Sequence, residues 1–304
     1  MRFSKYHLAV LALIGTNIIW GASIPIFRWS LESIPPFTFA FLRFFLASLI
    51  LLPLTLHRLK ITKHDAVSLF VLAVIGFFFH IGLLLFGLTT SSSVNSSVIA
   101  TAAPIFLITS SIFFYKENVR TRIILGTVIS LLGVAIIILR PIIDEGLDGT
   151  ILGNLLFLLS TLTFVGYTLL LKNYVTHLRS VTVTFYLFAY ATVIFFPFFL
   201  MESSQHHILS LLNEQAIIGI VFGAIFTSIF GYLFYNFGVK HIKASEIGVF
   251  LYVDPLVTVL VAVPLLHENI TPAFLTGAFF VFLGIYVAEK RIHYHPFHKL
   301  FRGT

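Results

Sequence analysis

Stretches of roughly 20 consecutive apolar residues recur along the whole chain, and no other feature limits its fold as strongly. A helix of that length spans the hydrocarbon core of a bilayer, which is roughly 30 Å thick. Only 10% of the 304 residues are charged, whereas soluble domains carry roughly 25%. Lipid admits helices or closed barrels, and the apolar runs do not alternate with a period of two. The sequence therefore predicts an all-α integral membrane protein.

The apolar runs divide into ten expected transmembrane helices with short connections. Their approximate ranges are 7–27, 37–56, 66–88, 93–115, 122–139, 149–172, 181–200, 215–238, 244–266 and 271–289. The first run follows Arg2 and Lys5 and could be mistaken for a signal peptide. We interpret Leu8–Phe27 as a retained span, because it is long for a signal peptide and completes the set of ten.

The stretch Val94–Arg140 occurs a second time, 151 positions later, with no gap. Self-similarity at a fixed offset indicates an architecture built from repeats. The second and seventh spans also align, at an offset of 144. We therefore predict two halves, 1–143 and 144–304, with five spans each. At the 151 offset, Pro104, Glu117, Asn118, Gly126 and Gly133 fall on Pro255, Glu268, Asn269, Gly277 and Gly284.

The two copies differ in charge at the polar break that each contains. Tyr115–Arg122 holds three basic residues, whereas Leu266–Pro272 holds none. Short loops rich in Lys and Arg stay on the cytoplasmic side of a membrane, so the copies are expected to be inverted, as in many secondary transporters. All but three of the 19 Lys and Arg residues fall on the side of the amino terminus. Both termini are thus predicted to be cytoplasmic, with Asp144–Asp148 and Glu268–Thr271 outside.

Composition excludes several classes of function. The net charge of +7 is scattered between the apolar spans, which is typical of a topology signal and not of nucleic-acid binding. The chain has no cysteine, which excludes disulfides and thiolate metal sites. His293, His295 and His298 lie beside Lys299 and Arg302, an arrangement that favours an anchor at the membrane interface over a metal site. We expect no cofactor and no metal.

Two ionisable residues, Arg43 and Asp254, lie inside expected spans, where charge is costly and normally faces a cavity or a partner. Arg43 could anchor a substrate carboxylate, and Asp254 could bind an ammonium group or couple proton movement. Alternatively, the two residues are structural and bind each other or the backbone freed by Pro255. The sequence leaves both interpretations open.

Two prolines and several polar residues complete the candidate site. Pro104 and Pro255 lie at matching positions of the two halves, where broken helices often form a site near the bilayer midplane. They could equally be plain kinks. Polar side chains in spans usually face inward, as cavity lining or as hydrogen bonds between helices. The candidates of this kind are Asn17, Trp20, His80, Asn154, Tyr167, Tyr232 and Tyr252.

Glu117 and Glu268 end the fourth and ninth spans on opposite expected faces. They could be mirrored gates, or they could only cap helices. Thr271 and Pro272 have the order of an N-cap residue followed by proline at the first helical position. This pattern favours capping.

The repeated segments Pro104–Leu139 and Pro255–Tyr286 resemble the two copies of the EamA domain of the drug/metabolite transporter superfamily. The second copy is the more similar, through Tyr252-Val253-Asp254-Pro255 followed by Glu268. Phe41-Leu42-Arg43-Phe44 resembles the arginine-bearing second span. Asn118 departs from the pattern, since a basic residue often follows the glutamate. The resemblance covers nearly the entire chain and implies ten transmembrane helices, cytoplasmic termini and movement of small metabolites, often export of amino acids.

The sequence as a whole predicts a secondary transporter with one central site between inverted halves. It would export amino-acid-like metabolites across the plasma membrane by alternating access, with aromatic ones first among the candidates. A single chain would hold a complete cavity. A membrane-embedded enzyme acting on lipid-linked substrates is the alternative, although the chain has no HExxH motif and no nucleotide-binding glycine loop. Nucleosides, cofactors and organic cations remain open as substrates, and a channel is disfavoured because no charged ring-forming helix is present.

Overall fold

The regular structure of the described residues is entirely helical. The computed structural model describes residues 5–56, 60–115, 121, 125–126, 128–129, 131–136, 149–174, 177–205, 208–242, 247, 250–251 and 253–289. The α-helices in the first half are α1 (Lys5–Leu31), α2 (Pro36–Thr55), α3 (Lys63–Ala73), α4 (His80–Thr90), α5 (Ser93–Ala100) and α6 (Ala103–Tyr115). Those in the second half are α8 (Gly149–Tyr174), α9 (Ser180–Gln205), α10 (Ile208–Leu211), α11 (Glu214–Phe222), α12 (Tyr232–His241), α14 (Val253–Leu266) and α15 (Pro272–Glu289). Two π-helices, η2 (Val74–Phe79) and η3 (Gly223–Gly231), join α3 to α4 and α11 to α12.

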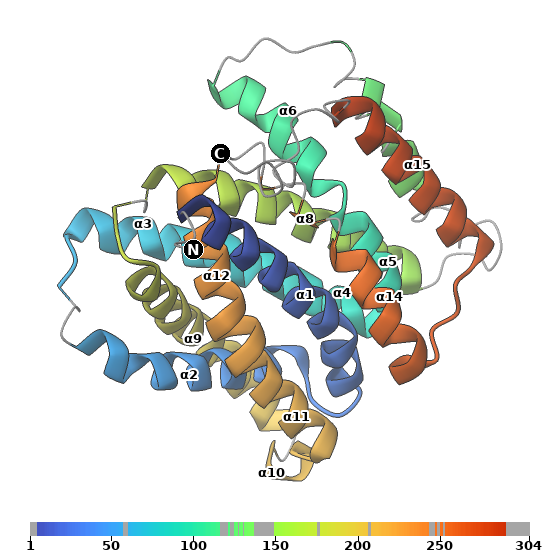
Figure 1. Cartoon of the computed structure of the whole chain (residues 1–304). Helices are drawn as coiled ribbons and strands as arrows, with labels where there is room; N and C mark the ends of the chain where they lie inside the picture. Colours follow the sequence, from blue (N-terminus) through green and yellow to red (C-terminus); the bar gives the residue numbers. More distant parts are fainter. Residues whose placement is uncertain are drawn as a thin grey trace.

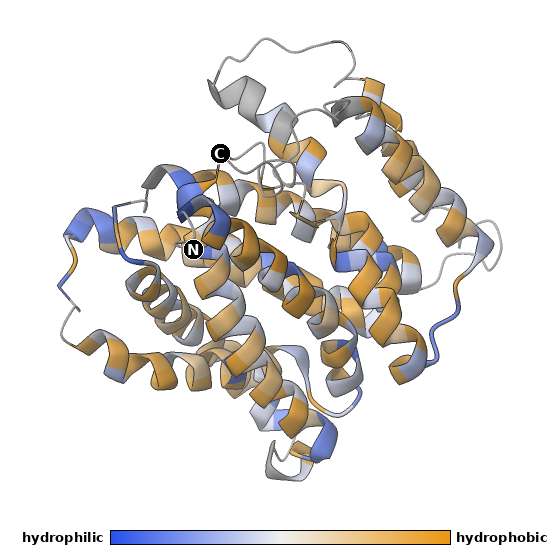
Figure 2. Cartoon of the chain, viewed as in Figure 1, coloured by the Kyte–Doolittle hydropathy of each residue, from blue (hydrophilic) through white to orange (hydrophobic). Residues whose placement is uncertain are grey.

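The helices have the length and composition of membrane spans. Within the described residues, six are long and apolar enough to cross a bilayer, and three shorter apolar helices accompany them: Ser93–Leu107, Val253–Leu266 and Pro272–Gly284. Most of the coloured helical ribbon is hydrophobic, and many of the hydrophilic residues lie near helix ends (Figure 2). The predicted helical membrane fold is confirmed. The count of ten stays a prediction, because the expected span 122–139 is described only in part, although its described residues are helical.

Short polar side chains begin several helices by accepting hydrogen bonds from free N–H groups of the first turn. Thr62 and Asp65 form a capping box at α3. Ser92 caps α5 through Asn95 N. Thr271 Oγ1 accepts from Phe274 N at 3.1 Å, directly before Pro272. The predicted N-cap and first-position proline of the last helix are therefore confirmed.

The expected fourth span is divided into two helices. It breaks at Thr101 and Ala102, between α5 and α6. Ala102 N donates to Ile99 O and Ala102 O accepts from Ile105 N, both bonds spanning three residues. Pro104 follows in the first turn of α6, where proline is tolerated because its missing N–H would have no partner inside the helix.

The internal duplication extends to the helix boundaries. Shifted by 144 positions, the first residues of α1 and α2 fall on those of α8 and α9. Shifted by 151 positions, the first residue of α3 and the last of α4 fall on the first of α11 and the last of α12. The same shift places η2 inside η3. π-Helices are rare and often lie at functional sites, so their matching positions indicate a duplicated functional element.

Helix packing repeats in the same way. α1 packs against α11, η3, α12 and α14, and Figure 1 shows it between α12 and α14. Its counterpart α8 packs against α3, η2, α4, α5 and α6. The equivalent helices α2 and α9 pack against each other. Each half thus builds its core against the other, and a cavity between the halves is lined by both.

Candidate functional site

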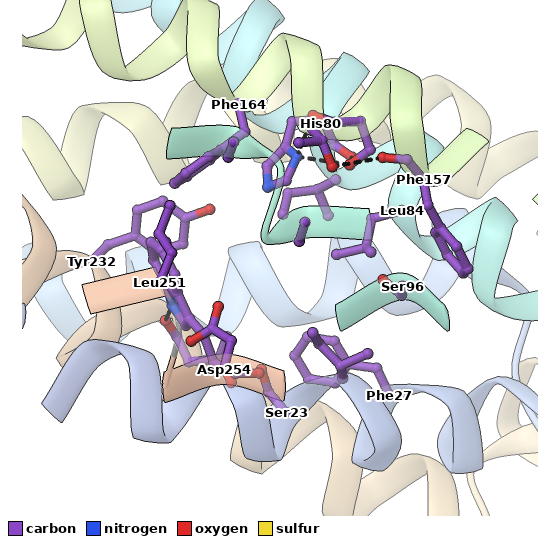
Figure 3. A pocket seen from close by; sticks show the side chains of 18 of the residues that line it. Ser23, Phe27, His80, Leu84, Ser96, Phe157, Phe164, Tyr232, Leu251 and Asp254 are labelled. Carbon is purple, nitrogen blue, oxygen red and sulfur yellow. Dashed lines mark hydrogen bonds between the residues drawn. The ribbon is translucent and has the colours of Figure 1, made fainter. Parts of the chain in front are cut away.

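A cavity of about 90 Å³ lies between the two halves. Such a space holds several water molecules, and hence part of a small-molecule ligand that carries a polar group. Side chains from both halves project into it, as Figure 3 shows for His80, Tyr232 and Asp254. The lining residues that carry polar side-chain atoms are Trp20, Ser23, Arg43, His80, Ser96, Ser160, Thr161, Thr227, Tyr232 and Asp254.

Arg43 is held firmly but only partly paired. Its side chain leaves α2, and the residue is 1% exposed. Nε donates to Ser228 Oγ of η3 at 2.8 Å. The guanidinium carbon lies 4.7 Å and 4.8 Å from the ring centres of Phe27 and Phe44, within range of cation–π attraction. A Cβ on Gly223 would meet Arg43 Cδ at 3.0 Å, so glycine leaves room for the arginine side chain. Nη1 and Nη2 have no partner among the described residues.

Asp254 is the second residue of α14, in the helix's first turn. The residue is 7% exposed, and its Oδ1 has no hydrogen-bond partner in the described part of the chain. Within that part, neither Asp254 nor Arg43 makes an ion pair, with each other or with a third residue. A buried charge without a partner is costly. A ligand that enters the cavity and pairs with either group would remove that cost, so both groups are available for binding.

His80 and Tyr232 directly follow the two π-helices and face the cavity. His80 Nδ1 lies 3.0 Å from Ser160 O and 2.8 Å from Ser160 Oγ, on α8. The Tyr232 ring packs against Trp20 and Phe77, with centres 5.1 Å and 5.0 Å apart. The wide turns of η2 and η3 therefore place one polar aromatic side chain from each half on the cavity wall.

Trp20 contributes an aromatic wall from α1. Its Nε1 donates to Thr227 O at 3.3 Å, and its ring lies 5.9 Å from that of Phe164. A Cβ on Gly231 would meet Trp20 Nε1 at 2.6 Å, so the absence of a side chain at Gly231 admits the indole. The aromatic rings give the cavity an apolar body around its few polar groups.

The helix breaks lie beside the same cavity. Ala100 and Ala103, on either side of the break before Pro104, both line it. Irregular backbone at membrane depth is tolerated where it borders a cavity or other protein. Pro255 is the third residue of α14, next to the cavity residue Asp254, and Leu251 lines the cavity just before that helix.

The structure places three sequence candidates outside the cavity lining. Asn17 Nδ2 donates to Leu13 O at 2.6 Å within α1. Asn154 Oδ1 accepts from Ser91 Oγ at 2.6 Å, which joins α8 to the segment before α5. Tyr167 is buried and lies with its ring edge-on to Phe77. Tyr252 and Glu117 lie outside the described residues.

Glu268 joins three separate helix ends. His267, with φ of 52°, turns the chain after α14 in the left-handed conformation that often ends helices. Glu268 Oε1 and Oε2 then accept from Ser93 N at 2.9 Å and Val94 N at 3.0 Å, at the start of α5. Arg28, in the last turn of α1, lies 3.4 Å from Oε1. Glu268 thus caps a helix from the other half of the chain.

Several residues of the site have no distinctive sequence signal. Ser228 and Ser160 are ordinary hydroxyl residues of apolar helices, and only their contacts with Arg43 and His80 identify them as part of the site.

Glu202, at the end of α9, accepts from Thr38 N at 2.6 Å and Phe37 N at 3.2 Å and so caps α2. Among the described residues, no group of three or more His, Asp or Glu side chains could hold a metal ion.

Comparison with known proteins agrees with this architecture. The model of the EamA-like transporter family matches twice, at residues 7–139 and 151–289. An uncharacterized transporter of Archaeoglobus fulgidus is 31% identical over 284 residues, covering 93% of this chain and 98% of the relative. The uncharacterized transporter YetK of Bacillus subtilis is 24% identical over 286 residues, covering 92% and 86%.

A solved crystal structure shares the fold, with a TM-score of 0.64 at 17% identity, over 92% of this chain and 96% of that chain. The fold, the duplicated match and the similar proteins agree with one another. This chain is a multi-pass membrane protein that belongs to the EamA-like transporter family.

Proposed function

We propose that the protein is a secondary transporter of small zwitterionic, amino-acid-like metabolites that works by alternating access around the central cavity. One observation carries the proposal. Arg43 Nη1 and Nη2 and Asp254 Oδ1 belong to residues that line the same cavity, and within the described chain all three atoms are buried without partners. A ligand with a carboxylate and an ammonium group would pair both charges, Arg43 binding the carboxylate through two parallel hydrogen bonds.

The duplicated scaffold carries this chemistry only once. Shifted by 144 positions, Arg43 falls on Leu187, and Asp254 falls back by 151 positions on Ala103. A pair of unlike charges in a pseudo-symmetric cavity suits a ligand with two unlike ends. The walls formed by Trp20, Phe164 and Tyr232 supply apolar area, so aromatic amino acids come first among the candidates.

The orientation completes the proposal. The halves would be inverted in the plasma membrane with both termini cytoplasmic, because the basic residues collect on that side. Export follows the family's common direction.

Relatives that carry the name uncharacterized transporter favour transport over a membrane-embedded enzyme. The single carboxylate and the single guanidinium that line the same cavity favour a zwitterion over nucleosides, cofactors or organic cations.

The test is counterflow in proteoliposomes that contain the purified full-length chain. A panel of amino acids, nucleosides and organic cations identifies the substrate class, and saturable exchange of any member supports transport. For the best amino acid, we expect its amide and its decarboxylated analogue to move far more slowly, because each lacks one of the two charges. Equal rates for the parent and both analogues would overturn the two-charge site.

A further inference from the structure

A reciprocal pair of hydrogen bonds sets the tautomer of His80. Ser160 Oγ donates to the carbonyl oxygen of His80 at 2.9 Å. His80 Nδ1 lies 3.0 Å from Ser160 O and 2.8 Å from Ser160 Oγ. Because the hydroxyl gives its single hydrogen to His80 O and Ser160 O can only accept, we assign the ring hydrogen to Nδ1. In the neutral ring, Nε2 is then a bare acceptor. It has no partner among the described residues, and Figure 3 shows His80 with this side of its ring toward the cavity and Tyr232.

The other half of the chain contains the same hydroxyl-to-carbonyl hydrogen bond without an imidazole. Shifted by 144 positions, Thr16 falls on Ser160, and His80 falls on Gly231 when shifted by 151. Thr16 Oγ1 donates to Gly231 O at 3.2 Å, as Ser160 Oγ donates to His80 O. The hydroxyl-to-carbonyl bond therefore joins the end of the π-helical segment to the neighbouring helix in both halves, at His80 directly after η2 and at Gly231, the last residue of η3. This hydrogen bond forms at Gly231 without an imidazole, so the ring of His80 is available for another role.

We propose that His80 Nε2 selects substrates whose side chain carries a hydrogen-bond donor, with Ser160 as its positioning residue. The ring centre of Phe164 lies 5.0 Å from that of His80, so the acceptor lies beside an aromatic wall of the cavity. The substrate class is then an aromatic zwitterion with an O–H or N–H on its ring, such as tyrosine or tryptophan. This inference rests on the proposed function, because it assigns the side-chain end of the same substrate.

The first test needs no variant. Purified wild-type protein in proteoliposomes is assayed for exchange of tyrosine against phenylalanine and of tryptophan against 1-methyltryptophan. A buried acceptor left unpaired is costly, so we expect kcat/KM to favour the donor-bearing member of each pair by about tenfold or more. Ratios near one, with saturable exchange of all four, would overturn this inference and leave the proposed function intact. Absence of exchange by any amino acid would overturn both.

Variants then assign the preference to Nε2. Asn at position 80 can still donate to Ser160 O but has no atom at the place of Nε2. In His80→Asn we expect both ratios to fall to about one, because tyrosine and tryptophan exchange should lose more than exchange of their partners without a donor. An equal fractional loss of tyrosine and phenylalanine exchange, with the ratio unchanged, would overturn the inference, because His80 would then serve turnover, for example as a proton carrier.

Ser160→Ala and Thr16→Ala form a matched pair, since each removes one hydroxyl-to-carbonyl bond at equivalent positions. Both should lower the melting temperature similarly. Only Ser160→Ala should reduce the tyrosine-to-phenylalanine ratio, because Ser160 Oγ also lies 2.8 Å from His80 Nδ1 and so helps to hold the ring, whereas Thr16 has no imidazole to hold. An equal change of the ratio in both variants would show that the preference follows general loosening and not the orientation of His80.

Discussion

At the scale of single residues, the cavity depends on groups that the fold holds in place but leaves unpaired. Arg43 is fixed by Ser228 and by two aromatic rings, yet its Nη1 and Nη2 have no partner in the part of the chain that the structure describes. Asp254 lies in the first turn of a helix, where the positive end of the helix dipole favours a carboxylate. Both residues are buried and line the same cavity.

The arginine's fork geometry is expected to matter more than its charge. Arg43→Lys keeps a cation but removes the planar donor pair and the bond to Ser228. We expect exchange of the amino acid to fall by roughly tenfold or more, because hydrogen bonds to charged groups contribute about 1.5–3 kcal/mol. Exchange of the decarboxylated analogue should change little. An equal loss for both substrates in counterflow assays would argue that Arg43 is structural.

Asp254 offers a test of proton coupling. If its carboxyl group binds and releases the coupling proton, Asp254→Asn cannot do so. We expect this variant to lose flux driven by a pH gradient and to retain most exchange between equal substrate pools. Both modes are measured in the same vesicles. Full retention of pH-driven flux would remove Asp254 from the mechanism, and a parallel loss of both modes and of folded protein would make it structural.

At the scale of helices, two devices recur. The π-helices η2 and η3 lie in the middle of equivalent long helices and end beside the cavity at His80 and Tyr232. Carboxylates from distant helix ends cap α2 and α5: Glu202 binds Phe37 and Thr38, and Glu268 binds Ser93 and Val94. Both caps satisfy N–H groups that helix geometry leaves free.

The cap formed by Glu268 can be tested against the cap formed by Glu202. Each glutamate replaced by Ala should destabilise the protein by about 1–2 kcal/mol, because capping groups contribute that much. The measurement is the thermal unfolding midpoint of the purified protein in detergent. If Glu268 is a cap and no more, both variants should keep their exchange rates once folded. A selective change of exchange rate in Glu268→Ala would support the alternative, that this residue is part of a gate.

At the scale of the whole molecule, the halves are interleaved rather than side by side. α1 packs on α12 and α14, α8 packs on α4 and α5, and α2 packs on α9. The pattern relates the halves by an approximate twofold arrangement. The charge of the connecting loops predicts how the halves are oriented in the membrane. The cavity lies where these pairs meet, so movement of one half against the other would change access to it.

Orientation can be measured directly because the chain has no cysteine of its own. A single cysteine introduced at position 120 should react with an impermeant reagent only after the membrane is opened. One introduced at position 146 should react in intact cells, since Asp144–Asp148 is predicted to lie outside. Labelling in the reverse order would overturn the predicted topology and the inversion of the halves.

Hydropathy and spacing determined the class of the protein. Spans of sufficient length, the polar breaks between them and the 151-residue repeat can all be seen in the sequence. Many helix ends follow them, whereas the break at Thr101 and Ala102 inside the fourth expected span does not. Hydropathy and spacing also selected Trp20, Arg43, His80, Tyr232 and Asp254, which the structure brings to one cavity. Polar residues are scarce in such a chain, and those inside spans usually face the interior of the helix bundle.

Only the tertiary structure decided which inward faces meet. Asn17, Asn154 and Tyr167 satisfied the same sequence criterion and lie outside the cavity lining. The reason is physical: in lipid, the surface against a neighbouring helix is no more apolar than the surface against the membrane, so periodicity does not reveal a helix's rotation. The two π-helices change that rotation part-way along a span without any mark in the sequence. Ser160 and Ser228 are therefore functional candidates only because the structure shows them within hydrogen-bond distance of His80 and Arg43.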